Sequence, residues 1–151
     1  MALPRGSVIF CMIRETLGGS ATNALSFYRT GSISMSERTT TGGSPSTQYG
    51  GPATPPYWLK VVRSGNSFSG YDSPDGVNWT QIGTTQTITM AQNVLIGMVV
   101  TNQSTSATAT GTFDNLGLAI GSTPFVTGVF PSLGGVGTSL QLTGSSYLSN
   151  W

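Results

Sequence analysis

The stretch YWLKVVRSGNSFSGYDSPDGVNWT, residues 57–80, decides the fold of this chain. Its first half alternates along an extended backbone, with Leu59 and Val61 on one face and Trp58 and Lys60 on the other. One face can therefore enter a hydrophobic core while the other stays at the surface. This alternation predicts a half-buried β-strand.

Two turns divide the same stretch into hairpins. Residues 64–66, Ser-Gly-Asn, tolerate positive φ, and Phe68 restarts the apolar pattern on a returning strand. In the second turn Pro74 fixes φ, the Asp75 side chain can accept hydrogen bonds from nearby backbone N–H groups, and Gly76 takes the left-handed position. The sequence therefore predicts two consecutive β-hairpins.

Short apolar segments continue in both directions from these hairpins. Gly, Pro, Ser, Thr and Asn separate them, and no window has the apolar spacing of an amphipathic helix. Residues 39–56 hold two Gly-Gly pairs and four prolines, which predict a long, exposed, irregular loop. The spacing predicts an all-β, predominantly antiparallel sandwich. The expected strands are residues 8–15, 25–30, 33–38, 57–64, 67–73, 78–82, 94–101 and 107–118.

The composition excludes several classes of function. Only 7% of the 151 residues are charged and the net charge is +1, so no basic surface for nucleic acid or for an anionic membrane is expected. The chain has no His, which removes the commonest general base and the commonest transition-metal ligand. Cys11 is the only cysteine, cannot form a disulfide within the chain, and is expected to be a small buried residue.

An ordered series of sequence blocks resembles a known family. The run from Trp58 to Thr80 is preceded by CMIRET at residues 11–16 and followed by VLIGMVVT at 94–101 and TFDNL at 112–116. Together these blocks resemble the concanavalin-A-like domain of bacterial secreted proteins, close to the regulation-of-enolase-type domain of unknown function. The resemblance covers about residues 9–118. It implies a two-sheet jelly roll that serves as an accessory module in extracellular enzymes and adhesins.

The resemblance also implies a domain organisation. Residues 1–120 are expected to form the jelly roll, incomplete at its N-terminus because the strands that precede the MIRE block in the family are missing. Residues 121–151 are expected to be a linker and a short β remnant. Its segment PFVTGVFPSLGGVGTSLQLTGSSYL, at 124–148, is similar to the opening of an immunoglobulin-like IPT/TIG domain.

Aromatic and polar side chains of the two hairpins are the candidate ligand site. Sugar rings stack their C–H faces on aromatic side chains, and sugar hydroxyls need polar partners beside them. The candidate ligand-binding residues are Trp58, Lys60, Tyr71 and Trp79. The alternative for each is a role in packing or in a turn, which is the common role of aromatic residues in strands.

The five carboxylates offer less. Glu15 and Glu37 are the candidate pair for a glycosidase, and the structural alternative is salt bridges with Arg14 and Arg38 or simple exposure. Asp72 and Asp75 are weak candidates for Ca²⁺, because two carboxylates are few for that ion, and the role of Asp75 in its turn is favoured.

The sequence favours a non-catalytic extracellular or cell-surface module that binds a polysaccharide or glycan or acts in adhesion. Two alternatives stay open: a structural module that self-associates through open sheet edges into a homo-oligomer, and a small glucanase-like hydrolase that uses Glu15 and Glu37. No cofactor, nucleic acid or membrane partner is expected, and no segment has the pattern of a signal peptide.

Overall fold

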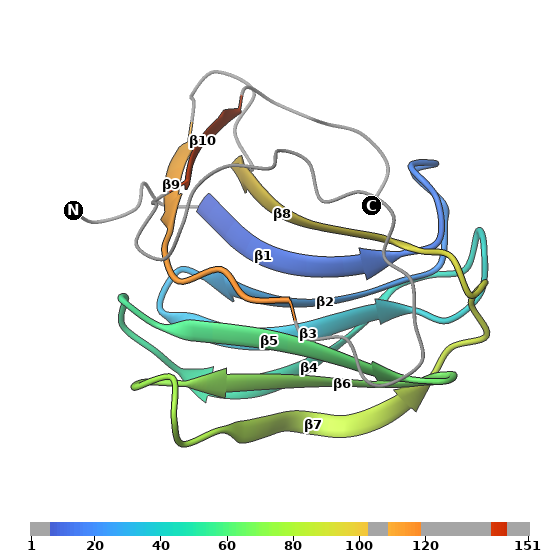
Figure 1. Cartoon of the computed structure of the whole chain (residues 1–151), viewed down its shortest axis with the longest axis horizontal. Helices are drawn as coiled ribbons and strands as arrows, with labels where there is room; N and C mark the ends of the chain where they lie inside the picture. Colours follow the sequence, from blue (N-terminus) through green and yellow to red (C-terminus); the bar gives the residue numbers. More distant parts are fainter. Residues whose placement is uncertain (1–6, 103–108, 119–139, 145–151) are drawn as a thin grey trace.

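β-Strands make up every regular element in the part of the chain that the structure describes. This computed structural model describes residues 7–102, 109–118 and 140–144. The strands are β1 (Ser7–Arg14), β2 (Asn23–Arg29), β3 (Ser32–Arg38), β4 (Ser46–Pro52), β5 (Trp58–Ser64), β6 (Ser67–Ser73), β7 (Thr80–Thr87), β8 (Leu95–Asn102), β9 (Ala109–Phe113) and β10 (Leu140–Gly144). Figure 1 shows a sandwich of two sheets, which confirms the predicted all-β antiparallel class.

The larger sheet has five strands in the order β4-β3-β2-β1-β8, and all its pairs are antiparallel. Successive hairpins join β1 to β4, whereas β8 comes back from the other sheet to pair with β1. Pairs such as Ile13 with Ala24 put every second side chain of neighbouring strands on the same face. The face that carries Ile13 and Ala24 is turned toward the smaller sheet.

The smaller sheet, β5-β6-β7, contains the stretch that decided the fold. A two-residue turn at Gly65 and Asn66 joins β5 to β6, with Gly65 at a φ of +61°. Leu59 and Val61 pack against the core, as their alternation predicted. Gly76 has a φ of +75°, which confirms the left-handed position expected in the second turn.

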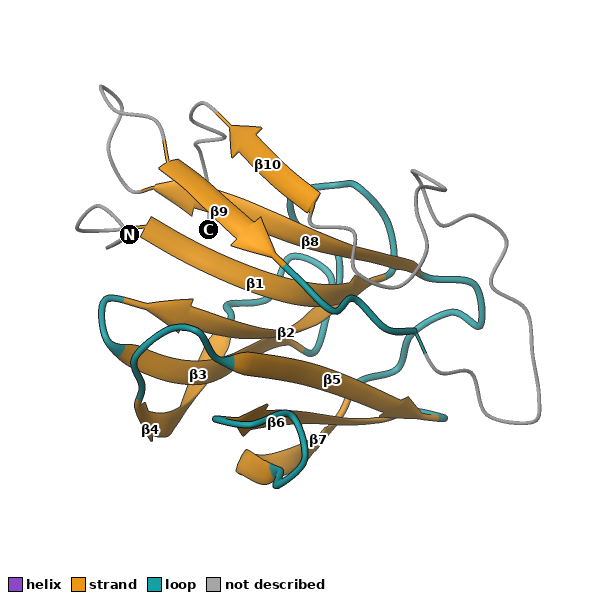
Figure 2. Cartoon of the chain, turned by 60° about the vertical axis from the view of Figure 1, so that its left-hand side comes forward, coloured by secondary structure: helices purple, strands orange, loops and turns teal. Residues whose placement is uncertain are grey.

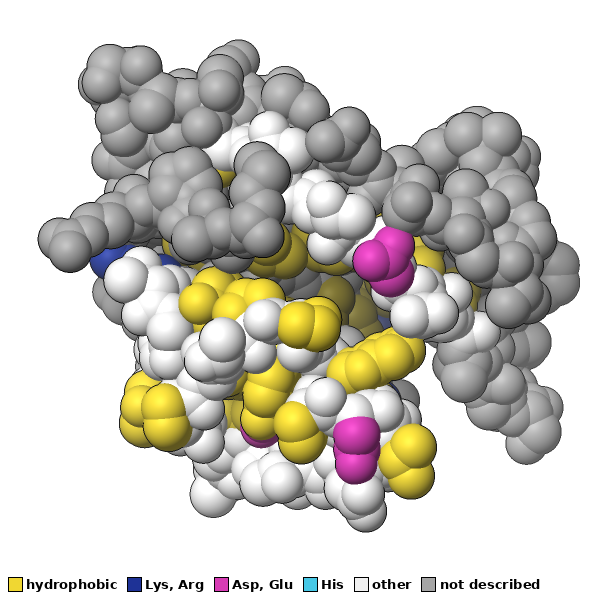
Figure 3. Space-filling view, turned by 90° about the vertical axis from the view of Figure 1, so that its left-hand side faces the viewer, with side chains coloured by type: hydrophobic (Ala, Val, Ile, Leu, Met, Phe, Trp, Pro, Cys, Tyr) yellow, Lys and Arg dark blue, Asp and Glu magenta, His cyan; other side chains and the backbone are white. Residues whose placement is uncertain are grey.

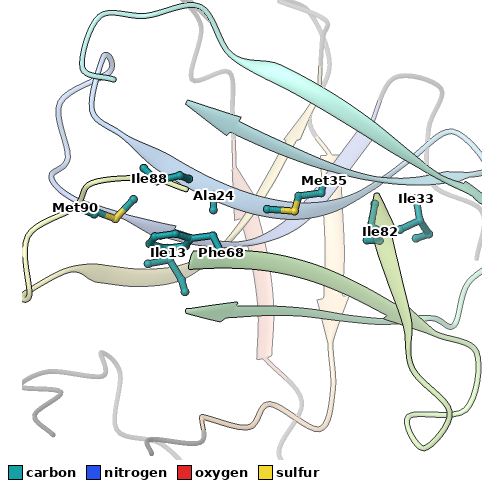
Figure 4. Packing of buried hydrophobic residues seen from close by; sticks show 8 residues of the cluster. All are labelled: Ile13, Ala24, Ile33, Met35, Phe68, Ile82, Ile88 and Met90. Carbon is teal, nitrogen blue, oxygen red and sulfur yellow. The ribbon is translucent and has the colours of Figure 1, made fainter. Parts of the chain in front are cut away.

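The core between the sheets holds the sandwich together. Figure 4 shows its side chains between the two layers. Phe68 and Ile82 of the smaller sheet and Met35 of the larger one are each 0% exposed. Burying one such side chain contributes about 1.5–3 kcal/mol, so the core fixes which face of each sheet is turned inward. The buried members are Ile13, Ala24, Ile33, Met35, Phe68, Ile82, Ile88 and Met90.

Polar contacts join the sheets at both sides of the core. On one side Gln48 of β4 accepts a hydrogen bond from the Thr84 amide at 2.7 Å and donates one to the Thr84 carbonyl at 3.3 Å. On the other side the Ser26 hydroxyl donates to the carbonyl oxygen of Lys60 at 3.2 Å. These bonds fix the position of the smaller sheet over the larger one.

Cys11 lies on the inner face of β1 and is half-buried. Its Sγ is 3.8 Å from the Ser26 carbonyl oxygen, to which it donates. Burial raises the pKa of the thiol to about 11, so the side chain is a neutral thiol at neutral pH. The structure thus gives Cys11 a packing role, although less complete burial than the sequence suggested.

The pair β9-β10 packs beside the smaller sheet, against the inner face of β1 and β8 (Figure 2). Gly111 of β9 makes the close approach possible, because a β-carbon there would lie 2.8 Å from Val100 Cγ2 and 2.9 Å from Ile9 Cδ1. The pairing of Leu140 with Phe113 joins the β remnant expected in residues 121–151 to a strand of the region expected to be the jelly roll.

The prediction that residues 39–56 form an irregular loop was wrong for residues 46–52, which form β4. The glycines and Pro52 suggested a loop, but β4 lies at the end of the sheet, where fewer ladder bonds are required. A β-bulge in the pairing with β3 absorbs Gly50, whose α-carbon lies close to Ile82. Tertiary contacts with β3 and β7 therefore override the local turn signals.

Two other strands differ from the prediction by more than two residues at one end. The strand expected at 78–82 is β7, Thr80–Thr87, because Gly83 at a φ of +61° forms an irregularity within the strand and does not end it. The strand expected at 107–118 is limited to Ala109–Phe113 within residues 109–118. Asn115 has a φ of +53°, a conformation that does not continue a strand.

Candidate functional site

The outer face of the smaller sheet carries the candidate ligand-binding residues. Because Leu59 and Val61 point into the core, Trp58 and Lys60 of β5 point outward. Tyr71 of β6 is the cross-strand partner of Lys60. Trp79, just before β7, approaches the same lysine. We call Trp58, Lys60, Tyr71 and Trp79 the aromatic platform.

Lys60 lies at the centre of the aromatic platform. Its Nζ is 3.9 Å from the centroid of the Trp79 ring and 4.8 Å from that of Tyr71. Each contact is short enough for a cation–π interaction, worth about 0.5–1 kcal/mol at an exposed site. The side chains of Lys60, Tyr71 and Trp79 are all half-buried, so part of each remains open to solvent.

Trp58 packs beneath the turn that links β6 to β7. A β-carbon at Gly76 would lie 2.7 Å from Trp58 Cε2, so the indole covers the α-carbon of this glycine directly. Figure 3 shows the molecule from the end where this turn lies. Hydrophobic side chains gather on the described part of that surface. The turn thus holds one end of the aromatic platform in place.

Asp75 organises this turn. Its Oδ1 accepts hydrogen bonds from the amides of Val77 and Asn78 at 2.8 Å and from the Ser73 hydroxyl at 2.9 Å, and its Oδ2 accepts one from Asn78 Nδ2 at 2.7 Å. These bonds, the backbone amide of Asn78 first, lower the pKa of the Asp75 carboxyl from its ordinary value. Both carboxylate oxygens of Asp75 are therefore used in hydrogen bonds within the turn, in agreement with the turn-forming role favoured from the sequence.

Asp72, the other weak Ca²⁺ candidate, faces inward near the end of β6 and is 8% exposed. Its carboxylate lies beside the Tyr57 hydroxyl, and partial burial, followed by the hydrogen bond to Asp72, raises the pKa of Tyr57. Among the described residues, Asp72 Oδ1 has no hydrogen-bond partner. No group of three or more metal-ligating side chains occurs in the described ranges.

The candidate catalytic carboxylates have local partners. Glu15 Oε1 accepts from the Ala91 amide at 2.9 Å and Oε2 from the Thr22 hydroxyl at 3.0 Å. Glu37 is 2% exposed, and its Oε1 accepts from the Ser46 hydroxyl. Both lie toward the same end of the inner face, where β2 separates them. In the described ranges neither forms a salt bridge with Arg14 or Arg38, because these arginines donate to carbonyl oxygens of the loop between β1 and β2.

Residues that the sequence analysis did not single out complete the outer face. Gln81 of β7 pairs with Tyr71 and is exposed, so it borders the aromatic platform. Next to it, the Ser69 and Thr85 hydroxyls are hydrogen-bonded at 2.8 Å. Placing Gln81 and Thr85 on this face requires the pairing register of β7 with β6. The irregularity at Gly83 shifts that register, and the sequence alone does not indicate the shift.

Arg63, the other basic residue of the smaller sheet, uses its guanidinium group in hydrogen bonds to the backbone. It donates to the carbonyl oxygens of Gly65, Ala91 and Met90, each at 2.8 Å. The segment that carries Met90 and Ala91 is thereby fixed from two sides, by Arg63 and by Glu15. Lys60 is left as the available cation of this sheet.

Compared with known proteins, the chain matches no family model, and no curated protein or solved structure gives a significant match. In the described ranges there is no helix with the length and apolar character needed to cross a membrane. The chemistry of the outer face is therefore the basis for assigning a function.

Proposed function

We propose that this chain is a non-catalytic carbohydrate-binding module that uses the aromatic platform of its smaller sheet. The observation that carries the proposal is the gathering of Tyr71 and Trp79 around Lys60 on one solvent-facing surface. Aromatic faces stack on sugar C–H groups, while an ammonium and an amide such as Gln81 bond the hydroxyls. One stacking ring with two polar partners supports affinities of about −4 to −8 kcal/mol, millimolar to micromolar.

The surrounding fold fits such a module. A concanavalin-A-like jelly roll is the finer topology we propose, supported by the long connection that returns β8 beside β1, as in a Greek key. The low charge and the many Ser and Thr residues suit a place outside the cell or on its surface. Adhesion through a surface glycan would use the same binding site.

A glycan array tests this proposal directly. We expect saturable binding by the wild-type protein and its loss in Tyr71→Ala and Trp79→Ala. Tyr49→Ala is the matched control, because Tyr49 of β4 is 67% exposed and belongs to the other sheet. Equal binding by all four proteins, or binding by none, would contradict a role for the aromatic platform.

The edge of the larger sheet favours a second candidate, a self-associating structural module. Among the described strands, β8 pairs with β1 alone and ends the sheet. Its sequence LIGMVVTN has no charged residue and no proline, and Leu95 and Ile96 are 43% and 48% exposed. Strand edges of this composition pair readily with other chains. A second copy placed antiparallel about a two-fold axis would continue the sheet across both molecules.

A further inference from the structure

The charge at the centre of the aromatic platform lacks a carboxylate partner within the described part of the chain. Lys60 Nζ lies over the rings of Tyr71 and Trp79 and forms no ion pair there. The acidic residue of the adjoining turn, Asp75, accepts hydrogen bonds from donors of that turn with both carboxylate oxygens. Arg63, the other cation of the sheet, already donates to three carbonyl oxygens. The face therefore presents one positive charge with no opposite charge bound to it.

Ring contacts hold this charge only weakly. A cation–π contact at a partly exposed site is weaker than a charge-assisted hydrogen bond from an ammonium to a carboxylate. The four-carbon side chain of lysine is also flexible, so its ammonium can turn from the rings toward a ligand. That movement would uncover the face of Trp79 on which the ammonium lies and leave it free to stack on a sugar.

We propose that the aromatic platform selects carboxylate-bearing sugars, the uronic acids, with Lys60 binding the carboxylate and Trp79 stacking on the ring of the same sugar. This inference rests on the proposed carbohydrate-binding function and adds the class of ligand. A neutral sugar has no carboxylate with which the Lys60 ammonium can form an ion pair. It must therefore either bind beside the lysine, or displace the ammonium from the rings and leave the lysine charge without a partner. An acidic sugar supplies the missing opposite charge.

A matched pair of polymers tests the selectivity. The full chain is titrated calorimetrically with polygalacturonate and with the same polymer after reduction of its carboxyl groups. We expect the acidic polymer to bind at least about tenfold more tightly, and its affinity to fall as NaCl is raised because salt screens the ion pair. Binding of the acidic polymer should also change the tryptophan fluorescence, since the ammonium leaves Trp79.

Variants of Lys60 identify the group responsible. Lys60→Gln should bind both polymers equally, at about the affinity of wild type for the neutral one, while Lys60→Arg keeps most of the preference. Circular dichroism checks that each variant is folded. Equal affinity of wild type for the two polymers, or a preference that survives in Lys60→Gln, overturns the inference. If wild type binds the two polymers equally and Trp79→Ala abolishes that binding, the carbohydrate-binding proposal stands without the preference for acidic sugars. If wild type binds no glycan at all, both the preference and the carbohydrate-binding proposal are overturned.

Discussion

The indole of Trp58 lies against the α-carbon of Gly76, so closely that a β-carbon at position 76 would come within 2.7 Å of Trp58 Cε2. Gly76 also has a φ of +75°, a conformation that side chains resist. Two independent constraints thus require glycine in the turn that supports the aromatic platform. The contact links the stability of this turn to the position of a candidate ligand-binding residue.

Gly76→Ala should therefore cost more than the strain of its backbone alone. That strain is about 1 kcal/mol, and displacement of the Trp58 ring adds to it. Gly42→Ala is the control, since Gly42 has a φ of +76° with nothing within 4 Å of an added β-carbon. Urea unfolding should show the larger loss for Gly76→Ala, with the excess removed in a Trp58→Ala background. Equal losses for the two glycine variants would show that the ring contact is unimportant.

The Asp75 carboxylate predicts a specific loss of stability in acid. Its folded-state pKa is lowered, chiefly by the Asn78 amide, from an unfolded value of about 3.9. Its contribution is thus present above about pH 4 and is lost as the pH falls through the folded pKa. The difference in Tm between wild type and Asp75→Asn should be constant from about pH 5 to 8 and narrow below about pH 4. A difference that persists undiminished at about pH 2 would argue against this role.

Glu15 is expected to act in stability and not in catalysis. Its hydrogen bonds to the Ala91 amide and the Thr22 hydroxyl are each worth about 1 kcal/mol, so Glu15→Ala should lower the free energy of unfolding by roughly 1–3 kcal/mol. Thr22→Val, which removes one of these bonds, should have a smaller effect. Assays on laminarin, xylan and cellulose should show no turnover. Turnover that Glu15→Gln or Glu37→Gln abolishes would instead establish the hydrolase.

The edge strand β8 predicts association of the chain in solution. Light scattering at high protein concentration should give a multiple of the 15.7 kDa monomer mass. Ile96→Lys places a charge on the edge and should restore the monomer, because an edge lysine opposes strand pairing. Val77→Lys is the control, since Val77 is 77% exposed in the turn beyond β6, away from β8. A wild-type protein that stays monomeric would refute association through this edge.

Alternation and turn chemistry predicted the centre of the fold well. Leu59 and Val61 share one face because a strand alternates with a period of two, and Gly76 turns because its neighbours Pro74 and Asp75 favour that turn. β4 could not be predicted, since its pairing depends on β3 and on the close approach of Gly50 to Ile82. Such contacts are tertiary and leave no local pattern.

The same distinction applies to the candidate site. Trp58 and Lys60 were placed on one face by alternation, but the position of Trp79 over the lysine depends on the path of a turn. The neighbouring Gln81 required the register of β7, which an irregularity at Gly83 shifts. Local sequence therefore supplied the residue types of the site, whereas their mutual positions required the structure.

The central claim, that the aromatic platform binds a glycan, is tested most directly by NMR shift mapping of the isotope-labelled chain during titration with an oligosaccharide of galacturonate. We expect the largest shifts at the indole N–H signals of Trp58 and Trp79 and at the amides of Lys60 and Tyr71, with an unchanged spectrum at Tyr49. No shift with this or any array-selected glycan, or shifts confined to the surroundings of β8 or of Glu15, would contradict the claim.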